Sequence, residues 1–348
     1  MLREIGGRSV GTDSPMYVVA EIGLNHGGSR QKALDMVDAA AQAGASAIKL
    51  QTLEARTLVA ESCPAPGHVQ ATSLREFFAT FELDAETHRA MVERARAHGL
   101  GVLTTPLAES AFEMLEPLNF DGYKIASGDI TYHALIAAAA RTGRPVILST
   151  GMASLWEVSS ALEVARDAGA TDIAILHCVS AYPTPASSQN LRAITTLANT
   201  FRVPVGLSDH GGTTDGAAPA LTLGACIYER HLVLEDDDAA VDRAVSSTPD
   251  ELKALIQRLE QTRIALGSGL KVCQPAETAN RHASRRGLYA RRPLRAGEIV
   301  SADDIAVVRP MSELAPWDLP LVVGRRLTRS MQEGEAFAAF DMALERAS

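Results

Sequence analysis

Cysteine is scarce in this chain, and its placement excludes two common kinds of stabilising site. The 348 residues include four cysteines, Cys63, Cys178, Cys226 and Cys273, and no two of them form a CxxC pair. The sequence therefore indicates neither a disulfide framework nor a thiolate zinc site. Cys178 and Cys226 lie inside strand-like apolar runs, so we interpret both as small core residues.

Long apolar runs and an excess of positive charge are also absent. The nearest approach to a membrane span is Ala134–Ala140, far below the ~18 residues that a span requires. The segment from Met1 to Arg8 lacks the apolar centre of a signal peptide. A net charge of −9 argues against nucleic acid or an anionic membrane as the main partner. We therefore expect a cytoplasmic protein with neither partner, in which any anionic ligand meets a local basic site.

Apolar strand-like runs alternate with helix-like segments eight times along the chain. We predict strands at Val18–Gly23, Ala47–Thr52, Gly101–Pro106, Gly122–Ser127, Pro145–Thr150, Asp172–Cys178, Pro204–Asp209 and Cys226–Leu232. The helical stretches between and after them include Arg30–Ala43, Ala85–His98, Ser154–Ala168, Thr214–Leu223 and Pro249–Leu266. Eight such units in about 265 residues predict an α/β fold, a parallel (β/α)8 TIM barrel. An open doubly wound sheet would need a GxGxxG turn after an early strand, and the sequence has none.

The pattern changes after residue 268. We predict a barrel domain over residues 1–268, a polar linker over 269–284 and a small C-terminal domain over 285–348. The last domain has about 60 residues, which is marginal for independent stability. We therefore expect it to dock on another surface.

Polar residues recur on one face of the predicted strands, because strand side chains alternate with a period of two. The inward-facing set is Glu21, Lys49, Gln51, Lys124, Ser149, His177, Ser208, His210, Glu229 and His231. In a TIM barrel the carboxyl ends of the strands build the active site. Buried lysine and glutamate are rare unless paired, so this set as a whole predicts a functional mouth. For His177 alone we favour a hydrogen-bonded core histidine, and for Asn25 a role in capping a loop is as plausible as lining the mouth.

The chemistry of the set suggests a metal beside an anion site. His210 and His231 end the last two strands, and neighbouring strands are about 4.8 Å apart, so both imidazoles can reach one metal ion. Lys49 and Lys124, with serine hydroxyls nearby, suit a phosphate or carboxylate ligand. A metal polarises a carbonyl, and Glu21 can position a hydroxyl or carry a proton. The residues thus suggest joining a phosphorylated, carboxylated molecule to a carbonyl compound.

Seven segments in sequence order carry a family resemblance. They are residues 20–28 (AEIGLNHGG), 47–52 (AIKLQT), 123–129 (YKIASGD), 147–152 (ILSTGM), 176–185 (LHCVSAYPTP), 206–210 (GLSDH) and 229–231 (ERH). Together they closely resemble the sialic acid synthase family, which includes N-acetylneuraminate, legionaminate and pseudaminate synthases. Residues 290–300 and 307–310 resemble that family's antifreeze-like (SAF) C-terminal domain.

The resemblance implies a transferase that forms a carbon–carbon bond. It implies condensation of phosphoenolpyruvate with an N-acylated mannosamine-type sugar, giving a nonulosonic acid and phosphate. It also implies a divalent metal held by His210 and His231, with Mn²⁺ first and Mg²⁺ or Co²⁺ as alternatives. The small domain of one subunit is expected to cover the barrel of the other in a domain-swapped homodimer.

By position, each remaining site residue takes a role from the family. Lys49, Lys124, Ser127, Ser149 and Ser208 match the phosphoenolpyruvate-binding set. Glu21, with the two histidines, is expected to be catalytic, while Tyr182, Ser180, Asp242 and Arg309 match sugar contacts. Arg309 is expected to come from the partner subunit.

Three departures from the family pattern lie on the sugar side. Residues 240–242 read Ala-Val-Asp in place of Gly-Pro-Asp, after the acidic run at 235–238. Ser180 stands where sialic acid enzymes carry asparagine. In the loop 60–73, His68 or Gln70 is expected to replace another asparagine. The reaction is therefore better specified than the acceptor.

Three other functions compete with this interpretation. The first is an aldolase that forms an imine at Lys49 or Lys124. The second is a metal-dependent synthase for a different, phosphorylated sugar acceptor. The third is a sugar-binding module or scaffold without catalysis, which would have no need of the charged residues at the mouth.

Overall fold

The computed structural model describes residues 2–64, 71, 73–235 and 239–346. The chain divides into two compact units, residues 1–267 and 268–348, and each is described by itself. Among the described residues, no helix combines the length and the apolar character that crossing a membrane requires.

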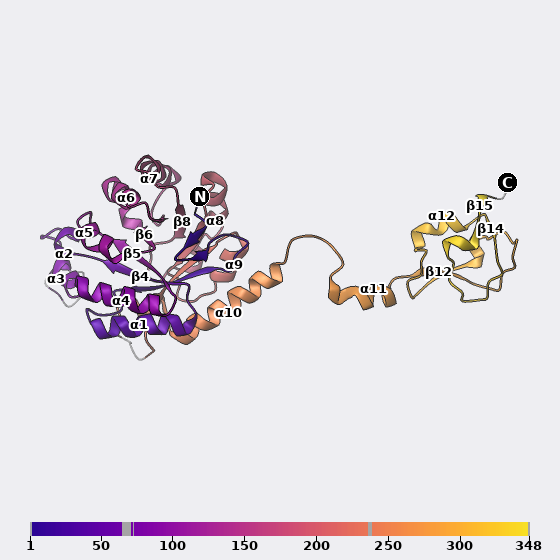
Figure 1. Ribbon diagram of the computed structural model, residues 1–348, viewed down its shortest axis with the longest axis horizontal. Coiled ribbons are helices and arrows are strands. Elements are labelled where there is room, and N and C mark those ends of the chain that lie inside the picture. Colours follow the sequence, from indigo (N-terminus) through magenta and orange to yellow (C-terminus); the bar gives the residue numbers. More distant parts are fainter. Residues whose placement is uncertain (1, 65–70, 72, 236–238, 347–348) are drawn as a thin grey trace. The chain divides into compact units, whose positions relative to one another are not determined.

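The first unit is a closed barrel of parallel strands, as predicted (Figure 1). In the described part of the chain its eight strands are β3 (Tyr17–Gly23), β4 (Ala47–Thr52), β5 (Gly101–Pro106), β6 (Gly122–Ile125), β7 (Val146–Ser149), β8 (Ile173–Cys178), β9 (Val205–Asp209) and β10 (Ile227–Leu232). Each strand pairs with the next, and β10 closes the ring by pairing with β3. The short β11 (Ser246–Ser247) continues the sheet beside β10.

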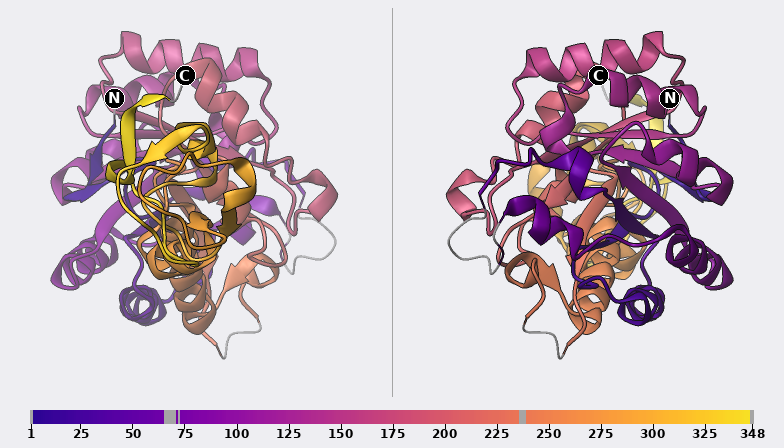
Figure 2. Two further views of the ribbon diagram at one scale, coloured as in Figure 1. Left: turned by 90° about the vertical axis from the view of Figure 1, so that its right-hand side faces the viewer. Right: turned by 90° about the vertical axis from the view of Figure 1, so that its left-hand side faces the viewer.

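Helices surround these strands (Figure 2). They are α1 (Arg30–Ala43), α2 (Ala55–Leu58), α3 (Leu74–Ala79), α4 (Ala85–Ala97), α5 (Ala111–Leu115), α6 (His133–Arg141), α7 (Leu155–Asp167), α8 (Ala193–Phe201), α9 (Ala217–Thr222) and α10 (Pro249–Leu266). The start of α10 follows its sequence signals: the Thr248 hydroxyl accepts from the Glu251 amide, the Glu251 carboxylate accepts from the Thr248 amide, and Pro249 occupies the first turn.

Two apolar layers fix which strand residues face inward. The larger core lies between strands and helices, and the smaller one fills the barrel interior. The interior core holds Val19, Ala47, Leu103, Ile147 and Ile227, closed off by residues of the N-terminal segment such as Leu2 and Ile5. Residues two positions further along several of these strands are polar, so the polar side chains lie above an apolar floor at the carboxyl ends.

One predicted strand phase is wrong. In β8 the interior core contains Ala174 and Leu176, whereas Ile173 and Ile175 belong to the outer core. His177 therefore faces the helices, and its Nε2 lies 2.8 Å from the Gln189 carbonyl oxygen. Burial lowers the pKa of His177. It is a hydrogen-bonded buried histidine outside the barrel, as the alternative interpretation held.

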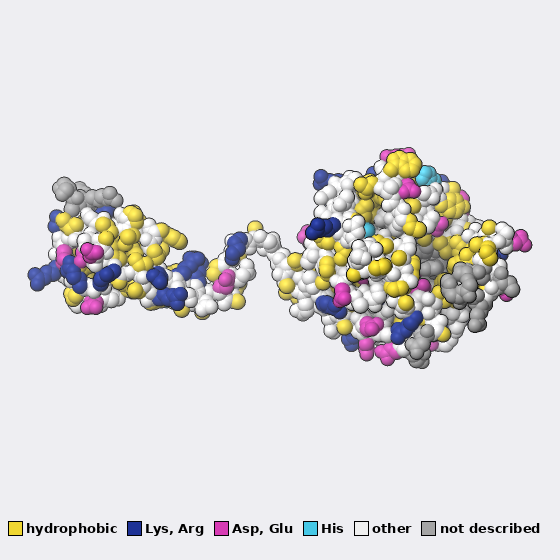
Figure 3. Space-filling view, turned by 180° about the vertical axis from the view of Figure 1, so that it is seen from behind, with side chains coloured by type: hydrophobic (Ala, Val, Ile, Leu, Met, Phe, Trp, Pro, Cys, Tyr) yellow, Lys and Arg dark blue, Asp and Glu magenta, His cyan; other side chains and the backbone are white. Residues whose placement is uncertain are grey.

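The second unit has its own core around short strands. It contains α11 (Thr278–Ser284), β12 (Gly287–Ala290), β13 (Ile305–Val308), α12 (Leu319–Val322), β14 (Arg325–Leu327) and β15 (Met342–Arg346), with β12 antiparallel to β13 and β14 to β15. The helix α11 lies in the segment predicted to be an irregular linker. The core includes Leu288, Val300, Ile305 and Phe337. Many Lys and Arg side chains lie on the surface of this unit (Figure 3).

Candidate active site

A cavity of about 250 Å³ opens at the carboxyl ends of the barrel strands. Its lining residues include Glu21, Lys49, Gln51, Thr105, Lys124, Ser127, Ser149, Cys178, Ser180, Tyr182, His210, Glu229 and His231. The polar residues come from seven of the strands and from the loops that follow them, as the alternation of strand side chains requires. The structure thus brings most of the predicted site residues around one space.

Glu229 is the centre of the charge network on the cavity wall. Its Oε1 accepts from the Lys124 ammonium at 2.7 Å and from the Ser208 hydroxyl at 2.8 Å. The Lys49 ammonium lies 3.7 Å from Oε2 of the same carboxylate. Burial alone would raise the pKa of Glu229, but Lys124 and Lys49 outweigh it and hold this pKa below its ordinary value. Glu229 is therefore a fixed anion that keeps two buried ammonium groups in place.

Glu21 shares Lys49 but has a different environment. Its Oε2 lies 2.6 Å from the Lys49 ammonium, and its Oε1 accepts from the Gln51 amide at 3.0 Å. Burial raises the pKa of Glu21; the Lys49 charge opposes this shift and the Glu229 charge adds to it, and the pKa stays above its ordinary value. Two carboxylates on one wall thus have pKa values shifted in opposite directions, an arrangement that separates a proton carrier from a permanent charge.

Serine hydroxyls also line the cavity. The Ser149 hydroxyl is buried and has no hydrogen-bond partner among the described residues. The Ser127 hydroxyl accepts from the Gly151 amide at 3.0 Å. A side chain at Gly151 would overlap the Ser180 hydroxyl and would lie 2.8 Å from that of Ser127. The glycine therefore allows both serines to approach the cavity, where an anionic ligand can accept their protons.

The two predicted histidines lie side by side. The ring centroids of His210 and His231 are 5.5 Å apart, and Tyr182 stacks at 4.2 Å from His210. Burial lowers the pKa of His210 to about 3 and that of His231 to about 4. Each Nδ1 lies near an oxygen, 3.4 Å from the Val179 carbonyl for His210 and 3.3 Å from the Asp242 carboxylate for His231. In a neutral His210 ring, a proton on the Nδ1 that faces the Val179 carbonyl leaves the lone pair on Nε2, the form in which histidine binds metals.

This donor set fits a divalent metal with open coordination positions. Within the described residues, no group of three or more histidine, cysteine or acidic side chains is arranged to hold a metal. The protein would therefore supply the two imidazoles, and bound molecules or water would supply the other ligands. His231 Nδ1 has no well-aligned hydrogen-bond acceptor, so the Asp242 contact orients that ring only loosely.

Some predicted residues lie elsewhere. Arg309 belongs to the second unit, where its side chain is exposed. Asp242 contacts His231 but is not among the lining residues of the cavity. Asn25, which follows β3, is hydrogen-bonded to the segment after β10. Its side-chain amide donates to the Leu232 carbonyl at 2.7 Å, and its side-chain oxygen accepts from the Asp242 amide at 2.9 Å. The expected sugar contacts His68 and Gln70, and most of the acidic run at 235–238, fall outside the described residues.

The sequence also left functional residues without a role. Thr105 accepts from the Lys49 ammonium at 3.1 Å, and the period of β5 could have placed it inward. The strand alternation predicts that Glu229 faces inward but gives it no role in the site. The sequence predicts a core position for Cys178, yet this residue lines the cavity with its sulfur 3.6 Å from Nδ1 of His210. Ala174 and Leu176 face the barrel interior, and the alternation of β8 side chains then puts Cys178 on the same face.

A parallel barrel with charged groups, hydroxyls and a histidine pair gathered at its carboxyl ends defines a TIM-barrel enzyme. Comparison with known proteins gives its family. The NeuB family model matches residues 36–271, and the SAF domain model matches residues 285–339. The chain belongs to the NeuB family, and its second unit contains a SAF domain.

Named relatives cover nearly the whole chain. It is 33% identical over 344 residues to the N,N'-diacetyllegionaminic acid synthase of Legionella pneumophila, covering 95% of this chain and 96% of the relative. It is 31% identical over 335 residues to a pseudaminic acid synthase of Campylobacter jejuni, covering 95% and 97%. The crystal structure of the N-acetylneuraminic acid synthetase of Leptospira borgpetersenii, in complex with citrate, matches with a TM-score of 0.73 and 32% identity, covering 80% of this chain and 94% of that one.

Proposed function

We propose that this protein is a metal-dependent nonulosonic acid synthase that condenses phosphoenolpyruvate with an N-acylated mannosamine-type sugar. One observation carries the proposal. Two buried ammonium groups, an unpartnered serine hydroxyl and a pair of neutral histidines line the same cavity of about 250 Å³. The family membership and the names of the relatives support the synthase class.

Phosphoenolpyruvate fits the ammonium and hydroxyl groups. Lys124 contacts Glu229 at 2.7 Å and keeps N–H bonds for a second anion, whereas Lys49 contacts Glu21, Thr105 and Glu229 and would contribute mainly its charge. The hydroxyls of Ser127 and Ser149 add directed donors. Ser208, the other predicted contact, donates its proton to Glu229 and would act by holding that carboxylate in place. Together these groups would supply positive charge and hydrogen-bond donors to a phosphate and a carboxylate and would hold the enol carbon toward the two histidines.

His210 and His231 would hold the divalent metal, with Mn²⁺ the first choice and Mg²⁺ or Co²⁺ as alternatives. When bound, such an ion polarises a carbonyl oxygen and so makes the sugar aldehyde a better electrophile. Their neutral state at pH 7, which burial enforces, means that no proton must be displaced before a metal binds.

The bonds of the proposed reaction balance as follows. C3 of phosphoenolpyruvate attacks the aldehyde carbon, which forms the new carbon–carbon bond and leaves C2 electron-deficient. Water adds to C2, and the C2–O bond to the phosphate then breaks, so the bridging oxygen leaves with inorganic phosphate. Glu21, whose pKa is raised and which lines the cavity, would receive the proton of the attacking water or give one to the new hydroxyl.

The acceptor is expected to contact Tyr182, Ser180 and Asp242 near the histidines. The name N,N'-diacetyllegionaminic acid of one relative's product contains two acetamido groups. Removing the three carbons of phosphoenolpyruvate from a nine-carbon product leaves a six-carbon sugar, so a 2,4-diacetamido-trideoxyhexose belongs among the acceptors to be tested beside N-acetylmannosamine. In a domain-swapped homodimer, Arg309 of the partner subunit would complete the sugar site.

The aldolase alternative is not favoured by the geometry. An imine requires a neutral lysine, but Lys124 is tied to Glu229 at 2.7 Å. Burial alone would lower the pKa of Lys124, yet the charge and hydrogen bond of Glu229, together with Cys178 and Glu21, outweigh it and raise this pKa above its ordinary value. Lys49 likewise contacts Glu21 at 2.6 Å. Both ammonium groups therefore suit anion binding better than nucleophilic attack.

An acceptor screen tests the proposal. Purified protein with Mn²⁺ and phosphoenolpyruvate is offered N-acetylmannosamine, its 6-phosphate and 2,4-diacetamido-trideoxyhexoses, and phosphate release is measured. We expect phosphate release with an unphosphorylated N-acylated sugar, in step with acceptor consumption. Phosphate release only with the 6-phosphate would favour the phosphorylated-acceptor alternative, and binding without any release would favour a sugar-binding module. Borohydride trapping of a carbonyl substrate on the protein, unaffected by a chelator, would instead favour the aldolase.

A further inference from the structure

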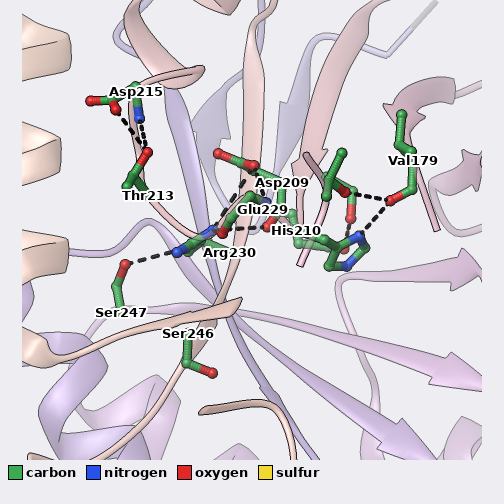
Figure 4. Close-up of polar contacts among 12 residues, drawn as sticks. Val179, Asp209, His210, Thr213, Asp215, Glu229, Arg230, Ser246 and Ser247 are labelled. Carbon is green, nitrogen blue, oxygen red and sulfur yellow. Dashed lines mark hydrogen bonds and ion pairs between the residues drawn. The ribbon is translucent and has the colours of Figure 1, made fainter. Parts of the chain in front are cut away.

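Asp209 and Arg230 lie directly behind the two histidines. Asp209 precedes His210 in the chain and Arg230 precedes His231, so their side chains face away from the cavity and toward the helices. Both are nevertheless buried, with exposed fractions of 3% and 2%. Figure 4 shows these residues as one polar cluster between β9 and β10.

The backbone pairing of β9 with β10 stops just before the histidines. Its last pair is Asp209 with Arg230, and β9 ends at Asp209. His210 is held on the other side by the Thr184 amide, which donates to its carbonyl at 2.7 Å. On the β10 side, no ladder bond between the two strands fixes its position relative to His231.

The Arg230 guanidinium links the two strands beyond the point where their backbone hydrogen bonds end. Its Nη1 donates to the Gly211 carbonyl at 2.6 Å and lies 3.4 Å from the Asp209 carbonyl, so it contacts the backbone on both sides of His210. Its Nε donates to the Ser247 hydroxyl at 3.2 Å, which ties the same side chain to β11 (Figure 4). One planar group thus joins the segment that carries His210 to the strand that carries His231.

Asp209 completes the cluster from the β9 side. Its Oδ1 accepts from the Gly211 amide at 2.8 Å and lies 3.9 Å from Arg230, and its Oδ2 accepts from the Tyr228 hydroxyl at 2.6 Å. A buried ion pair adds little net stability, because desolvation offsets the attraction. Its larger effect here is to restrict the geometry of the chain between Asp209 and Gly211.

We propose that Arg230, supported by Asp209, is a positioning residue that sets the separation and orientation of the His210 and His231 imidazoles for metal binding. This inference rests on the proposed metal role of the two histidines. It assigns a metal-site function to a side chain that lies on the opposite face of the sheet from the metal.

The test is Mn²⁺ affinity in the full-length protein without substrate, measured from the free-ion electron paramagnetic resonance signal. Arg230→Lys keeps the charge but loses the planar fork, and Asp209→Asn keeps an acceptor for the Gly211 amide but loses the charge. We expect Arg230→Lys to weaken Mn²⁺ binding by about 10- to 100-fold, the usual range for a residue that supports a metal ligand, and Asp209→Asn to weaken it less.

His88→Gln is the matched control. His88 is another buried polar residue of the same barrel, hydrogen-bonded to Thr52 and to the Asp84 carbonyl, and it contacts neither predicted metal ligand. It should lower the unfolding temperature while leaving Mn²⁺ affinity unchanged. If Arg230→Lys does not fold, Asp209→Asn against His88→Gln gives the same comparison.

The outcomes separate this inference from the proposed function. Weaker Mn²⁺ binding in the Arg230 or Asp209 variant than in His88→Gln supports it. Wild-type affinity in a folded Arg230→Lys protein, or an equal loss in His88→Gln, overturns the positioning role and leaves the metal proposal intact. Failure of the wild-type protein to bind Mn²⁺ overturns the metal proposal and this inference with it.

Discussion

Lys49 lies between two carboxylates of opposite character, with its ammonium 2.6 Å from Glu21 and 3.7 Å from Glu229. Burial raises the pKa of Glu21, whereas Lys124 and Lys49 overcome burial and lower that of Glu229. The two glutamates should therefore respond differently to the same substitution.

We predict that Glu229→Gln destabilises the protein by about 3–5 kcal/mol, because it leaves buried ammonium groups without their anion. Glu21→Gln should cost clearly less stability and should act mainly on turnover. Urea unfolding of both variants at pH 7, together with steady-state rates, checks this. Equal losses of unfolding free energy in the two variants would show that Glu21 and Glu229 contribute equally to stability, which contradicts this prediction.

Gly151→Ala should weaken phosphoenolpyruvate binding. The added methyl group would overlap the Ser180 hydroxyl and lie 2.8 Å from that of Ser127, so at least one serine must move. We expect an increase in KM for phosphoenolpyruvate of at least about tenfold, equivalent to about 1.4 kcal/mol. Gly212→Ala is the control, since its methyl group would meet only Pro183 at an ordinary 3.8 Å. An unchanged KM for phosphoenolpyruvate in Gly151→Ala would show that these serines do not contribute to binding the anion.

Acid should destabilise the barrel through buried histidines. Burial, with the charges of His88 and Lys32, lowers the pKa of His26 to about 4, and burial also lowers that of His88. The unfolded chain, with histidine pKa values near 6.5, then binds more protons between about pH 6.5 and 4. The free energy of unfolding should fall as pH falls through this window, by at most about 1.4 kcal/mol per pH unit per histidine.

Urea midpoints at pH 7, 6 and 5 measure that slope. His26 Nδ1 accepts from the Gly28 amide at 3.0 Å, a bond that protonation of this nitrogen would break. His26→Gln should therefore flatten the dependence of stability on pH. A slope equal to that of the wild-type protein would show that His26 titrates normally in the folded state.

A mixing experiment tests whether Arg309 acts across subunits. Arg309→Ala should weaken sugar use, and His210→Ala should abolish turnover. If Arg309 serves the partner's barrel, a mixed dimer has one complete site: the barrel of the Arg309→Ala subunit receives arginine from the other chain. Random mixing of equal amounts gives half mixed dimers, hence about a quarter of wild-type turnover at low acceptor concentration. No recovery above the separate variants would place Arg309 in its own subunit's site or outside any site.

Much of the barrel could be predicted because a buried parallel strand is a short, nearly continuous apolar run between turns. A continuous apolar run does not show which of its residues face the barrel interior, so the inward face of β8 could not be predicted. Both of its faces are apolar until His177 and Cys178, and choosing the more polar residue as inward gave the wrong face. The short helix α11 was missed because all its residues are exposed, so it has no apolar stripe to mark its period.

The candidate site was predictable where charge marked it. Lys49, Lys124 and the two histidines stand out in apolar strands, and the structure gathers them around one cavity. Thr105 carries no charge and follows another threonine, so only its contact with Lys49 reveals it. The tie from Arg230 to the backbone on both sides of His210 depends on three-dimensional register, which the sequence alone does not contain.

The most direct test of the account is phosphate release from phosphoenolpyruvate labelled with ¹⁸O at the bridging oxygen, with an N-acylated sugar acceptor and Mn²⁺. The account predicts that the label appears in the phosphate. It also predicts that release stops without acceptor or with a chelator, and falls by orders of magnitude in His210→Ala and His231→Ala proteins that keep their fold. Label retained in the sugar product, or full turnover by either histidine variant in the presence of chelator, would contradict it.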